Sequence, residues 1–203
     1  MSKTSASGSR RLKSCVMATV AARESYFTTG LEVLADQGIG GLKLAAVCGR
    51  LGVTTGSFYH YFPSWSAYTR ELVDYWMQDL TVRLSELFKQ QPDPRKRMQF
   101  IISTVLSLPH SAEAAIRAWS SIDPEVHAVQ AEVDRVRFKV CYDYALEVSG
   151  DHRQSELFAY WSSYLLVGYE QATLDRDPKV YEVIANQMCD DLEAGRFAGA
   201  PRT

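Results

Sequence analysis

The sequence lacks any apolar run long enough to cross a membrane, and it contains few cysteines. No stretch of the 203 residues approaches the roughly 18 unbroken apolar residues that a membrane span needs. The four cysteines, Cys15, Cys48, Cys141 and Cys189, lie far apart, and none belongs to the CxxC spacing of a zinc ribbon or dithiol redox site. We therefore expect a cytoplasmic protein with reduced thiols and no contact with membranes.

Motifs of the common enzyme classes are missing as well. The chain has no HExxH, P-loop, GxGxxG or GxSxG motif, and no histidine follows a glutamate by three residues, as a ferritin-like di-metal site needs. Asp123 and His127 are four residues apart, but one such pair more often forms a hydrogen bond at the start of a helix. The sequence thus predicts a protein that is not an enzyme, with no metal site and no cofactor.

Strand-like alternation of apolar and polar residues is absent, and helical periodicity takes its place. Prolines and Gly150 separate long segments in which apolar residues recur every three or four positions. Residues 68–87 repeat in this way, and so do residues 95–108, 126–140 and 181–192. The pattern predicts an all-α fold of about nine helices.

Charge is distributed unevenly along the chain. Residues 1–62 hold seven Lys or Arg against three acids, whereas the remainder holds 15 basic and 21 acidic residues. A basic head on an acidic body suggests that the head meets a polyanion. The first residues are basic and rich in serine. We expect a disordered arm there instead of a targeting signal, because the apolar run at 15–22 is interrupted by Thr19 and leads directly into a helical pattern.

Residues 42–62 read as two short helices joined by a tight turn. Leu44, Val47 and Leu51 share one face of the first helix, and Gly52 can take the left-handed conformation that ends it. Thr54 can cap the second helix, whose Phe58 and Phe62 face inward. The second helix then exposes Thr55, Ser57, Tyr59 and His60.

These exposed residues suit a DNA groove. Hydroxyl groups can donate to phosphate oxygens, His60 can reach a phosphate or a base edge, and Gly56 lets the backbone approach the sugar–phosphate closely. A helical hairpin inside any bundle can show the same spacing, so the pattern alone leaves both interpretations open. The predicted DNA-contacting residues are Lys43, Thr54, Thr55, Gly56, Ser57, Tyr59 and His60, together with Arg10, Arg11 and Lys13 of the arm.

Residues 24–68 resemble the N-terminal DNA-binding domain of the tetracycline-repressor (TetR) family of bacterial transcription regulators. The first helix of that domain is matched by Tyr26, Phe27, Leu31, Leu34, Ala35 and Gly38, and the recognition helix by Val53, Thr54, Gly56, Phe58, Tyr59, Tyr61 and Phe62. The resemblance implies a three-helix DNA-binding domain, a larger helical body that binds a small molecule, and a homodimer on double-stranded DNA. The corresponding division is a basic arm at 1–17, the DNA-binding domain at 18–63, a ligand-binding and dimerisation domain at 64–197, and a tail at 198–203.

Three positions depart from the family pattern. Lys43 stands where the family usually has a Thr or Ser helix cap, and Ser66 replaces a usual Glu. Trp65 occupies the place of a Lys that touches phosphate in the family. Losing that cation predicts weaker DNA binding with less salt dependence, which Arg10, Arg11 and Lys13 could offset by following the DNA backbone or entering the minor groove.

The helix at 157–169 is apolar around most of its circumference, which implies burial on two sides. One interpretation is a dimer interface, for which the helices at about 152–174 and 178–194 would pack against their partners. The other is a central helix of a large core. The predicted interface residues are Tyr160, Tyr164, Val167, Gly168, Ile184 and Met188.

Aromatic residues of the body suggest a pocket for an apolar or aromatic effector. The predicted lining is Trp76, Phe100, Thr104, Trp119, Tyr142, Trp161 and Tyr164, although core packing would explain each aromatic residue equally well. The sequence therefore predicts a TetR-like regulator, most simply a repressor, that binds a near-palindromic operator as a homodimer and is released by a ligand. The alternative is a helical ligand- or protein-binding adaptor that has lost sequence-specific DNA binding.

Overall fold

The computed structural model describes the backbone of residues 5–199 and the side chains of residues 22–78 and 81–197. Within this part of the chain all regular structure is helical, which confirms the all-α prediction. The α-helices are α1 (Ser5–Gly41), α2 (Leu44–Leu51), α3 (Thr55–Tyr61), α4 (Trp65–Met77), α5 (Arg83–Phe88), α6 (Pro94–Leu106), α7 (His110–Ser120), α8 (Pro124–Ser149), α9 (His152–Gln171) and α10 (Pro178–Glu193). A π-helical turn η1 (Gln78–Val82) joins α4 to α5, and a 3₁₀ turn η2 (Arg196–Gly199) follows α10.

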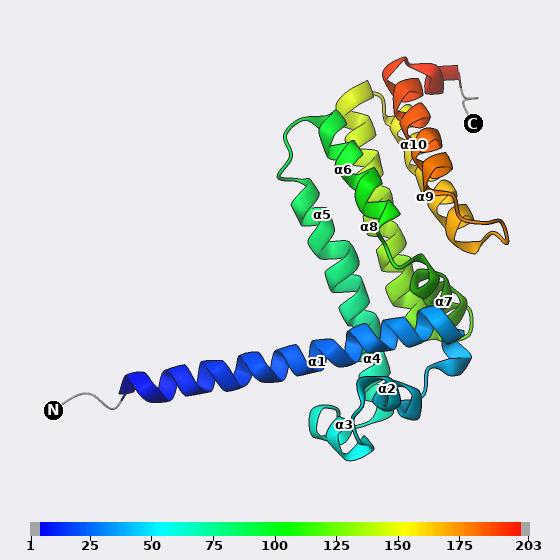
Figure 1. Ribbon diagram of the computed structural model, residues 1–203. Coiled ribbons are helices and arrows are strands. Elements are labelled where there is room, and N and C mark those ends of the chain that lie inside the picture. Colours follow the sequence, from blue (N-terminus) through cyan, green and yellow to red (C-terminus); the bar gives the residue numbers. More distant parts are fainter. Residues whose placement is uncertain (1–4, 200–203) are drawn as a thin grey trace.

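The helices form a small head and a larger body (Figure 1). Helices α2 and α3 lie below α1, and α4 leaves them and continues through η1 and α5 toward the body. The body is formed mainly by α6, α8, α9 and α10, while α7 packs against both α1 and α8. The α4–η1–α5 rod is therefore a continuous connection between head and body.

Helix α1 begins earlier than the sequence predicted. We expected disorder over residues 1–17, but the backbone is helical from Ser5. Residues 5–22 contain no proline and several good helix formers, so a helix packed at its C-terminal end can extend in the N-terminal direction one hydrogen bond at a time. The predicted DNA contacts Arg10, Arg11 and Lys13 lie outside the side chains that the structure describes.

Aspartate and proline define where the long body helices start. Asp93, Asp123 and Asp177 each accept hydrogen bonds from backbone N–H groups of the first turn, and each is followed directly by proline. Proline fits the first helical position because its missing N–H would have no partner there. These boundaries are therefore encoded locally.

Two apolar cores lie along the molecule. The first joins the head to α4, α7 and the beginning of α8, and includes the fully buried Phe58, Phe62 and Trp76. The second lies among α6, α8, α9 and α10. Phe100, which was predicted to line a pocket, is 46% exposed on α6. Since α7 and α4 belong to the same core as α3, the head is packed directly against elements of the body.

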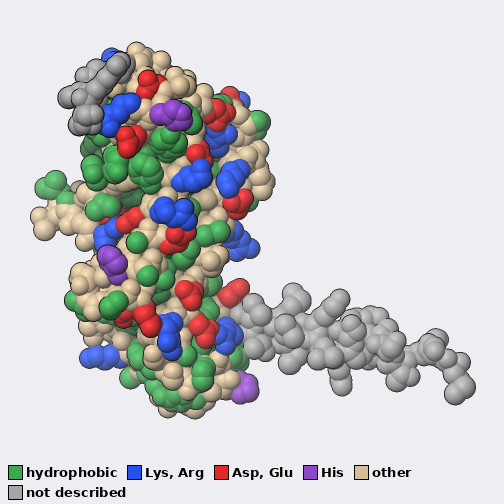
Figure 2. All heavy atoms as spheres, turned by 180° about the vertical axis from the view of Figure 1, so that it is seen from behind, with side chains coloured by type: hydrophobic (Ala, Val, Ile, Leu, Met, Phe, Trp, Pro, Cys, Tyr) green, Lys and Arg blue, Asp and Glu red, His purple; other side chains and the backbone are tan. Residues whose placement is uncertain are grey.

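The molecular surface carries charges of both signs. Figure 2 shows acidic and basic side chains intermixed over the face of the body that it presents. Many of them are paired, as Arg97 is with Glu147 and Lys139 with Asp143. Among the described residues, no helix is long and apolar enough to cross a membrane.

Candidate functional site

The turn between α2 and α3 is made by Gly52. This residue has φ 68° and ψ 29°, the left-handed conformation that glycine adopts without strain, and its N–H donates to carbonyl oxygens of α2. The N–H of Val53 donates to the carbonyl of Cys48 over 3.0 Å. The predicted helix–turn–helix geometry is thereby confirmed at the residue that ends α2.

Thr54 sets the start of α3. Its side-chain oxygen accepts a hydrogen bond from the backbone N–H of Ser57 over 3.2 Å, and the hydroxyls of these two residues lie 3.1 Å apart. By contrast, Lys43 precedes α2 without making a side-chain cap, as expected from its departure from the family pattern. The second helix of the motif is therefore fixed more firmly at its start than the first.

Burial on one side of α3 determines what the other side exposes. Phe58 and Phe62 are completely buried, whereas Tyr59 is 54% exposed. Thr55, Gly56, Ser57 and His60 are also exposed. The structure thus gathers the six predicted contact residues of positions 54–60 at one helix and its cap, with Lys43 exposed before α2.

A cluster of aromatic rings holds α3 in place. Phe58 packs edge-on against Tyr26 of α1 and Tyr68 of α4, with ring centroids 5.7 and 5.3 Å apart. Tyr68 donates a buried hydrogen bond to the carbonyl of Tyr26 over 2.8 Å. Gly30 permits this approach, since a Cβ there would lie 2.2 Å from the Tyr68 hydroxyl. The recognition helix is consequently held against two longer helices.

Arg23 ties the end of α3 to α1 and α4. Its guanidinium donates to the carbonyl of Tyr61 over 2.6 Å, pairs with Glu71 of α4, and lies 4.5 Å from the centre of the Phe62 ring. Sequence analysis counted Arg23 only as one of the basic charges of the head. Its structural role could not be found from helical spacing, because its partners lie 38 to 48 residues away.

Neither the backbone conformation nor the packing within the protein requires glycine at position 56. It lies in the first turn of α3, is exposed, and a Cβ built there would meet only the Thr54 hydroxyl, at 3.6 Å. Glycine inside a helix costs about 1 kcal/mol relative to alanine. Gly49 of α2 is equally open, so both short helices present small residues to the surroundings.

Trp65 is used for packing. Its ring lies 5.0 Å from that of Tyr68 and 5.8 Å from that of Phe58, and its side chain is half-buried at the first position of α4. Ser64 caps this helix by accepting from the N–H of Ala67. The position where the family has a cationic side chain thus supports the aromatic cluster under α3.

A helix–turn–helix with an exposed polar recognition helix, joined to a larger helical body, defines a DNA-binding regulator of the helix-turn-helix class. Residues 27–66 match the family described as bacterial regulatory proteins, tetR family. This match over residues 27–66 confirms the resemblance of the N-terminal segment to the DNA-binding domain of that family. The match ends at the beginning of α4 and does not extend into the body.

Solved structures share the fold over most of the chain. A transcriptional regulator from Rhodococcus sp. Rha1 is 16% identical and has a TM-score of 0.68, with 85% of this chain and 96% of that chain covered. Reduced NemR from E. coli is 19% identical with a TM-score of 0.66, covering 83% and 95%. The regulator FadR from Bacillus subtilis, in complex with stearoyl-CoA, is 16% identical with a TM-score of 0.56, covering 85% and 98%. At these identities the likeness extends to the fold only, and no curated protein matches the chain by sequence.

The body contains a largely apolar cavity. Its empty volume is about 840 Å³, counted with the solvent at its mouth, and it lies among η1, α5, α6, α8, α9 and α10. Aliphatic side chains and methionines form most of the lining, and Phe88, Phe158 and Tyr181 are its aromatic members. A mostly apolar lining with a few polar groups is typical of small-molecule sites.

Most of the predicted pocket residues do not line this cavity. Of the seven, only Thr104 does. Trp76 and Trp119 are buried in the first core, while Phe100, Trp161 and Tyr164 are exposed and Tyr142 is half-buried on α8, where it bonds to His152. An aromatic residue satisfies a core, a surface and a pocket equally well, so its type does not reveal which one it occupies.

The predicted interface residues fall into two groups. Tyr160, Tyr164, Gly168 and Ile184 are exposed on α9 and α10, and Val167 is half-buried. Met188, in contrast, is 6% exposed and lines the cavity, so it belongs to the protomer's own core. Ile184 and Met188 are one helical turn apart, yet Ile184 is 41% exposed and Met188 is buried, so the apolar stripe that they share in the sequence is divided between the surface and the core.

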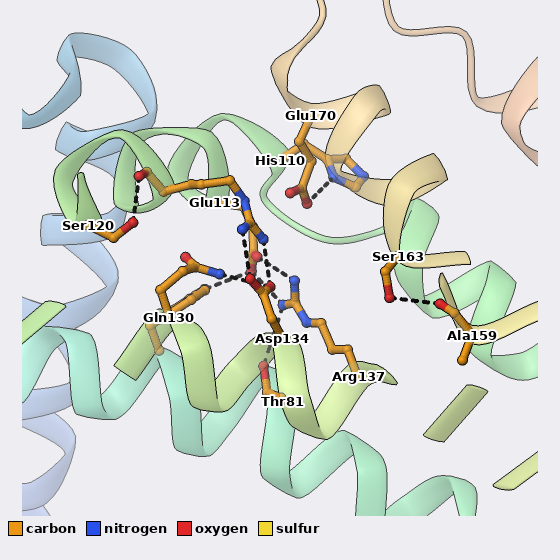
Figure 3. A network of polar contacts seen from close by, with 12 residues as sticks. Thr81, His110, Glu113, Ser120, Gln130, Asp134, Arg137, Ala159, Ser163 and Glu170 are labelled. Carbon is orange, nitrogen blue, oxygen red and sulfur yellow. Dashed lines mark hydrogen bonds and ion pairs between the residues drawn. The ribbon is translucent and has the colours of Figure 1, made fainter. Parts of the chain in front are cut away.

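A buried ionic network lies between the cavity and the head (Figure 3). Glu113 of α7, 2% exposed, pairs with Arg137 of α8 over 2.8 Å and accepts from the indole N–H of Trp76 over 2.7 Å. Burial is the largest single influence on the pKa of Arg137 and lowers it, but the charge and hydrogen bond of Glu113, together with the charges of Glu170 and Asp134, raise it by more in sum. The net pKa is therefore raised and the guanidinium stays charged. Sequence analysis missed this network; its only trace is a charged residue at a buried helical position.

Proposed function

We propose that this chain is a transcriptional repressor that binds a near-palindromic operator as a homodimer and leaves it when a small molecule enters the body. The observation that carries the proposal is the division of α3, where Phe58 and Phe62 are buried while Thr55, Tyr59 and His60 point to solvent. A recognition helix needs this arrangement because one face anchors it and the other contacts base edges and phosphates.

Homodimerisation is supported by the outer face of the body. Tyr160, Trp161 and Tyr164 of α9 and Val180 and Val183 of α10 are exposed large apolar side chains. Exposed large apolar side chains on neighbouring helices are typical of an interaction surface, and a two-fold dimer is the commonest way to cover one. Two heads on such a dimer would lie in successive major grooves, roughly 34–36 Å apart.

Release by a ligand is supported by the position of the cavity. Thr81 of η1 and Leu84 of α5 line it, and both lie on the rod that continues from α4 in the head. A ligand that favours one position of this rod shifts the spacing of the two recognition helices. Such coupling is typically worth 1–3 kcal/mol and is reciprocal, so DNA weakens ligand binding to the same extent. FadR from Bacillus subtilis, which has a similar fold, is known in complex with stearoyl-CoA.

The decisive experiment is selection from a random duplex library by the purified chain at near-physiological salt. Enrichment of a near-palindromic site supports the proposal, and that site then serves to measure affinity, stoichiometry and release. Deleting residues 1–14 should lower the affinity if the basic N-terminal residues contact DNA; unchanged affinity would remove them from the interface.

Failure to enrich any sequence would contradict the proposal, provided that the protein is folded and dimeric. The replacement of a cationic residue by Trp65 would then be a loss of function. The chain would be better understood as a ligand- or protein-binding adaptor built on a DNA-binding fold.

A further inference from the structure

Among the residues whose side chains the structure describes, Arg137 is the only formally charged one that lines the cavity. The polar members of the lining are otherwise hydroxyl and thiol groups, such as Thr81, Ser162 and Cys141. Several of the hydroxyls already donate to the backbone, as Ser162 does to the carbonyl of Phe158. In an apolar pocket, the few charged groups fix the orientation and the chemical class of the ligand. Arg137 is therefore the group that can discriminate between ligands.

The guanidinium of Arg137, a residue of α8, contacts side chains of two other elements, α7 and η1. One amino group lies 2.8 Å from Glu113 of α7, and the other is 3.1 Å from the second oxygen of the same carboxylate. The second amino group also lies 3.4 Å from the hydroxyl of Thr81 in η1. Figure 3 shows Arg137 reaching from α8 toward these partners. A new anion in the cavity would compete with Glu113 for this one cation.

If Arg137 no longer paired with Glu113, the contacts of Glu113 with α4 would change as well. Glu113 also accepts the indole N–H of Trp76, a completely buried residue of α4, and the Arg137 guanidinium lies 6.0 Å from the centre of the Trp76 ring. A buried carboxylate deprived of its ion-pair partner is strongly destabilised, so α7 and α4 must adjust around it. Three side chains thus connect the cavity wall to the helix that carries the recognition helix.

We propose that the effector is an amphipathic carboxylate with an unbranched aliphatic chain, and that Arg137 selects it by its acidic head group. The aliphatic lining accommodates the chain, and the carboxylate pairs with Arg137 in competition with Glu113. The loosened Glu113 then shifts Trp76 and α4. This inference rests on the proposed function for its consequence at DNA, whereas the ligand class can be tested without DNA.

Other head groups make different demands on the site. A neutral alcohol gains the apolar contacts but leaves the Arg137–Glu113 pair undisturbed. A cationic head group is repelled by Arg137, and only the acidic residues of the network, Glu113, Asp134 and Glu170, would attract it. Three probes with one chain length therefore separate the possibilities: decanoate, 1-decanol and decyltrimethylammonium.

Binding of each probe to the full-length protein can be measured by calorimetry at concentrations below micelle formation. We expect decanoate to bind about tenfold more tightly than 1-decanol, because a hydrogen bond to a charged group is typically worth that much. Decyltrimethylammonium should bind more weakly than either. Equal binding of decanoate and decanol, preference for the cation, or no binding of decanoate to the folded protein would each overturn the proposal.

Paired variants test the role of Arg137 itself. Glu113→Gln keeps an acceptor for Trp76 but removes the competing charge, so decanoate should bind several-fold more tightly than to the unmodified protein. Arg137→Met combined with Glu113→Gln leaves no unpaired buried charge and should abolish the preference for decanoate over decanol. Retention of the preference in this double variant would contradict the assignment.

A neighbouring ion pair supplies the matched control. Arg117 and Asp134 join α7 to α8 through two hydrogen bonds of 2.7 and 2.8 Å, and neither residue lines the cavity. Arg117→Gln with Asp134→Asn removes a similar pair from the same two helices. This double variant should still bind decanoate more tightly than 1-decanol. Loss of that preference would mean that helix packing, and not the Arg137 charge, selects the ligand.

Coupling to DNA is tested with Trp76→Phe, which removes the indole N–H and keeps an aromatic ring. Decanoate should still bind, but the ratio of DNA affinities without and with decanoate should fall toward one. An unchanged ratio would eliminate the route through Trp76. If the protein binds decanoate but no DNA sequence, the ligand assignment stands and the proposed regulatory function fails.

Discussion

Individual side chains at the DNA-facing surface depend on buried neighbours in the same helix. Tyr59 projects outward because Phe58 beside it is completely buried, and Thr54 fixes the helix start by accepting the N–H of Ser57. The same residue-level logic applies to the cysteines, whose surroundings control their chemistry. Two predictions concern single side chains of these kinds.

Tyr59→Phe should weaken DNA binding without changing folding. The hydroxyl is exposed and contributes nothing to the aromatic cluster, so the melting temperature should stay the same. Loss of one hydrogen bond to DNA corresponds to about 1 kcal/mol, or roughly fivefold in affinity. Titration with the selected duplex measures this. Tyr142→Phe, which removes a hydroxyl from the body, is the matched control, and an equal loss there would refute a contact by Tyr59.

The buried thiols should react slowly with alkylating reagents. Burial raises the pKa of Cys48, Cys141 and Cys189, that of Cys141 from 9.0 to about 11. The thiolate is the reactive form, so at pH 8 Cys141 should hold roughly a hundredfold less of it than in the unfolded chain. Iodoacetamide labelling followed by mass spectrometry, in native buffer and in guanidinium, compares the two states. Rapid native labelling of Cys141 would contradict this and would indicate a redox-accessible cavity.

Whole elements behave as units in this protein, and α4 is the most important of them. It packs under α3 through Trp65 and Tyr68, accepts Arg23 through Glu71, and continues into η1 without an end cap of its own. A π-helical turn in such a position often marks a functional site, because one widened turn disturbs the regular hydrogen-bond ladder. The proposed ligand site at η1 and the proposed DNA-contacting helix α3 are therefore connected through the continuous α4–η1–α5 rod.

Trp65→Lys should strengthen DNA binding and weaken the fold. A lysine at the start of α4 restores the cation that the family has there, and the logarithmic salt dependence should steepen by about 0.9 for each added phosphate contact. Loss of ring packing against Tyr68 and Phe58 should lower the melting temperature. Trp65→Leu is the control that loses the ring without gaining charge; a steeper salt dependence in that variant as well would rule out a phosphate contact.

At the scale of the whole molecule, the proposed function depends on how two copies of the chain would pair. Helices α9 and α10, which carry exposed apolar side chains, lie in the body away from α3, so a dimer formed through them would leave both heads free (Figure 1). The separation of the heads then depends on the rigidity of the body. Oligomeric state is therefore inseparable from operator recognition.

Tyr164→Glu combined with Val183→Glu should give a folded monomer that binds operator far more weakly. The two side chains are each 68% exposed, so the substitutions cost the protomer little, but a dimer would bury both charges without partners. Sedimentation or light scattering measures the state, and duplex titration measures the affinity. Ile122→Glu, at an equally exposed apolar position before α8, should remain dimeric. A variant that stays dimeric with both glutamates would exclude this face as the interface.

The sequence by itself determined the helical class and the helix–turn–helix, and the Asp-Pro pairs fix the starts of three body helices, but the start of α1 was predicted wrongly. Gly52, Thr54 and the Asp-Pro pairs act through their own backbone and the next few residues, and burial of Phe58 and Phe62 follows from a one-turn spacing. Such local information is readable along the chain because hydrogen bonds of caps and turns span only three or four residues.

Only the tertiary structure decided which apolar residues line the cavity, which form the outer face and which are core. Trp76, Phe100 and Trp161 have similar sequence surroundings, yet one is in the first core and two are exposed. The Arg137–Glu113–Trp76 connection joins residues 24 and 37 positions apart. Helical periodicity specifies that a face is apolar, but the packing angles between helices determine what that face meets.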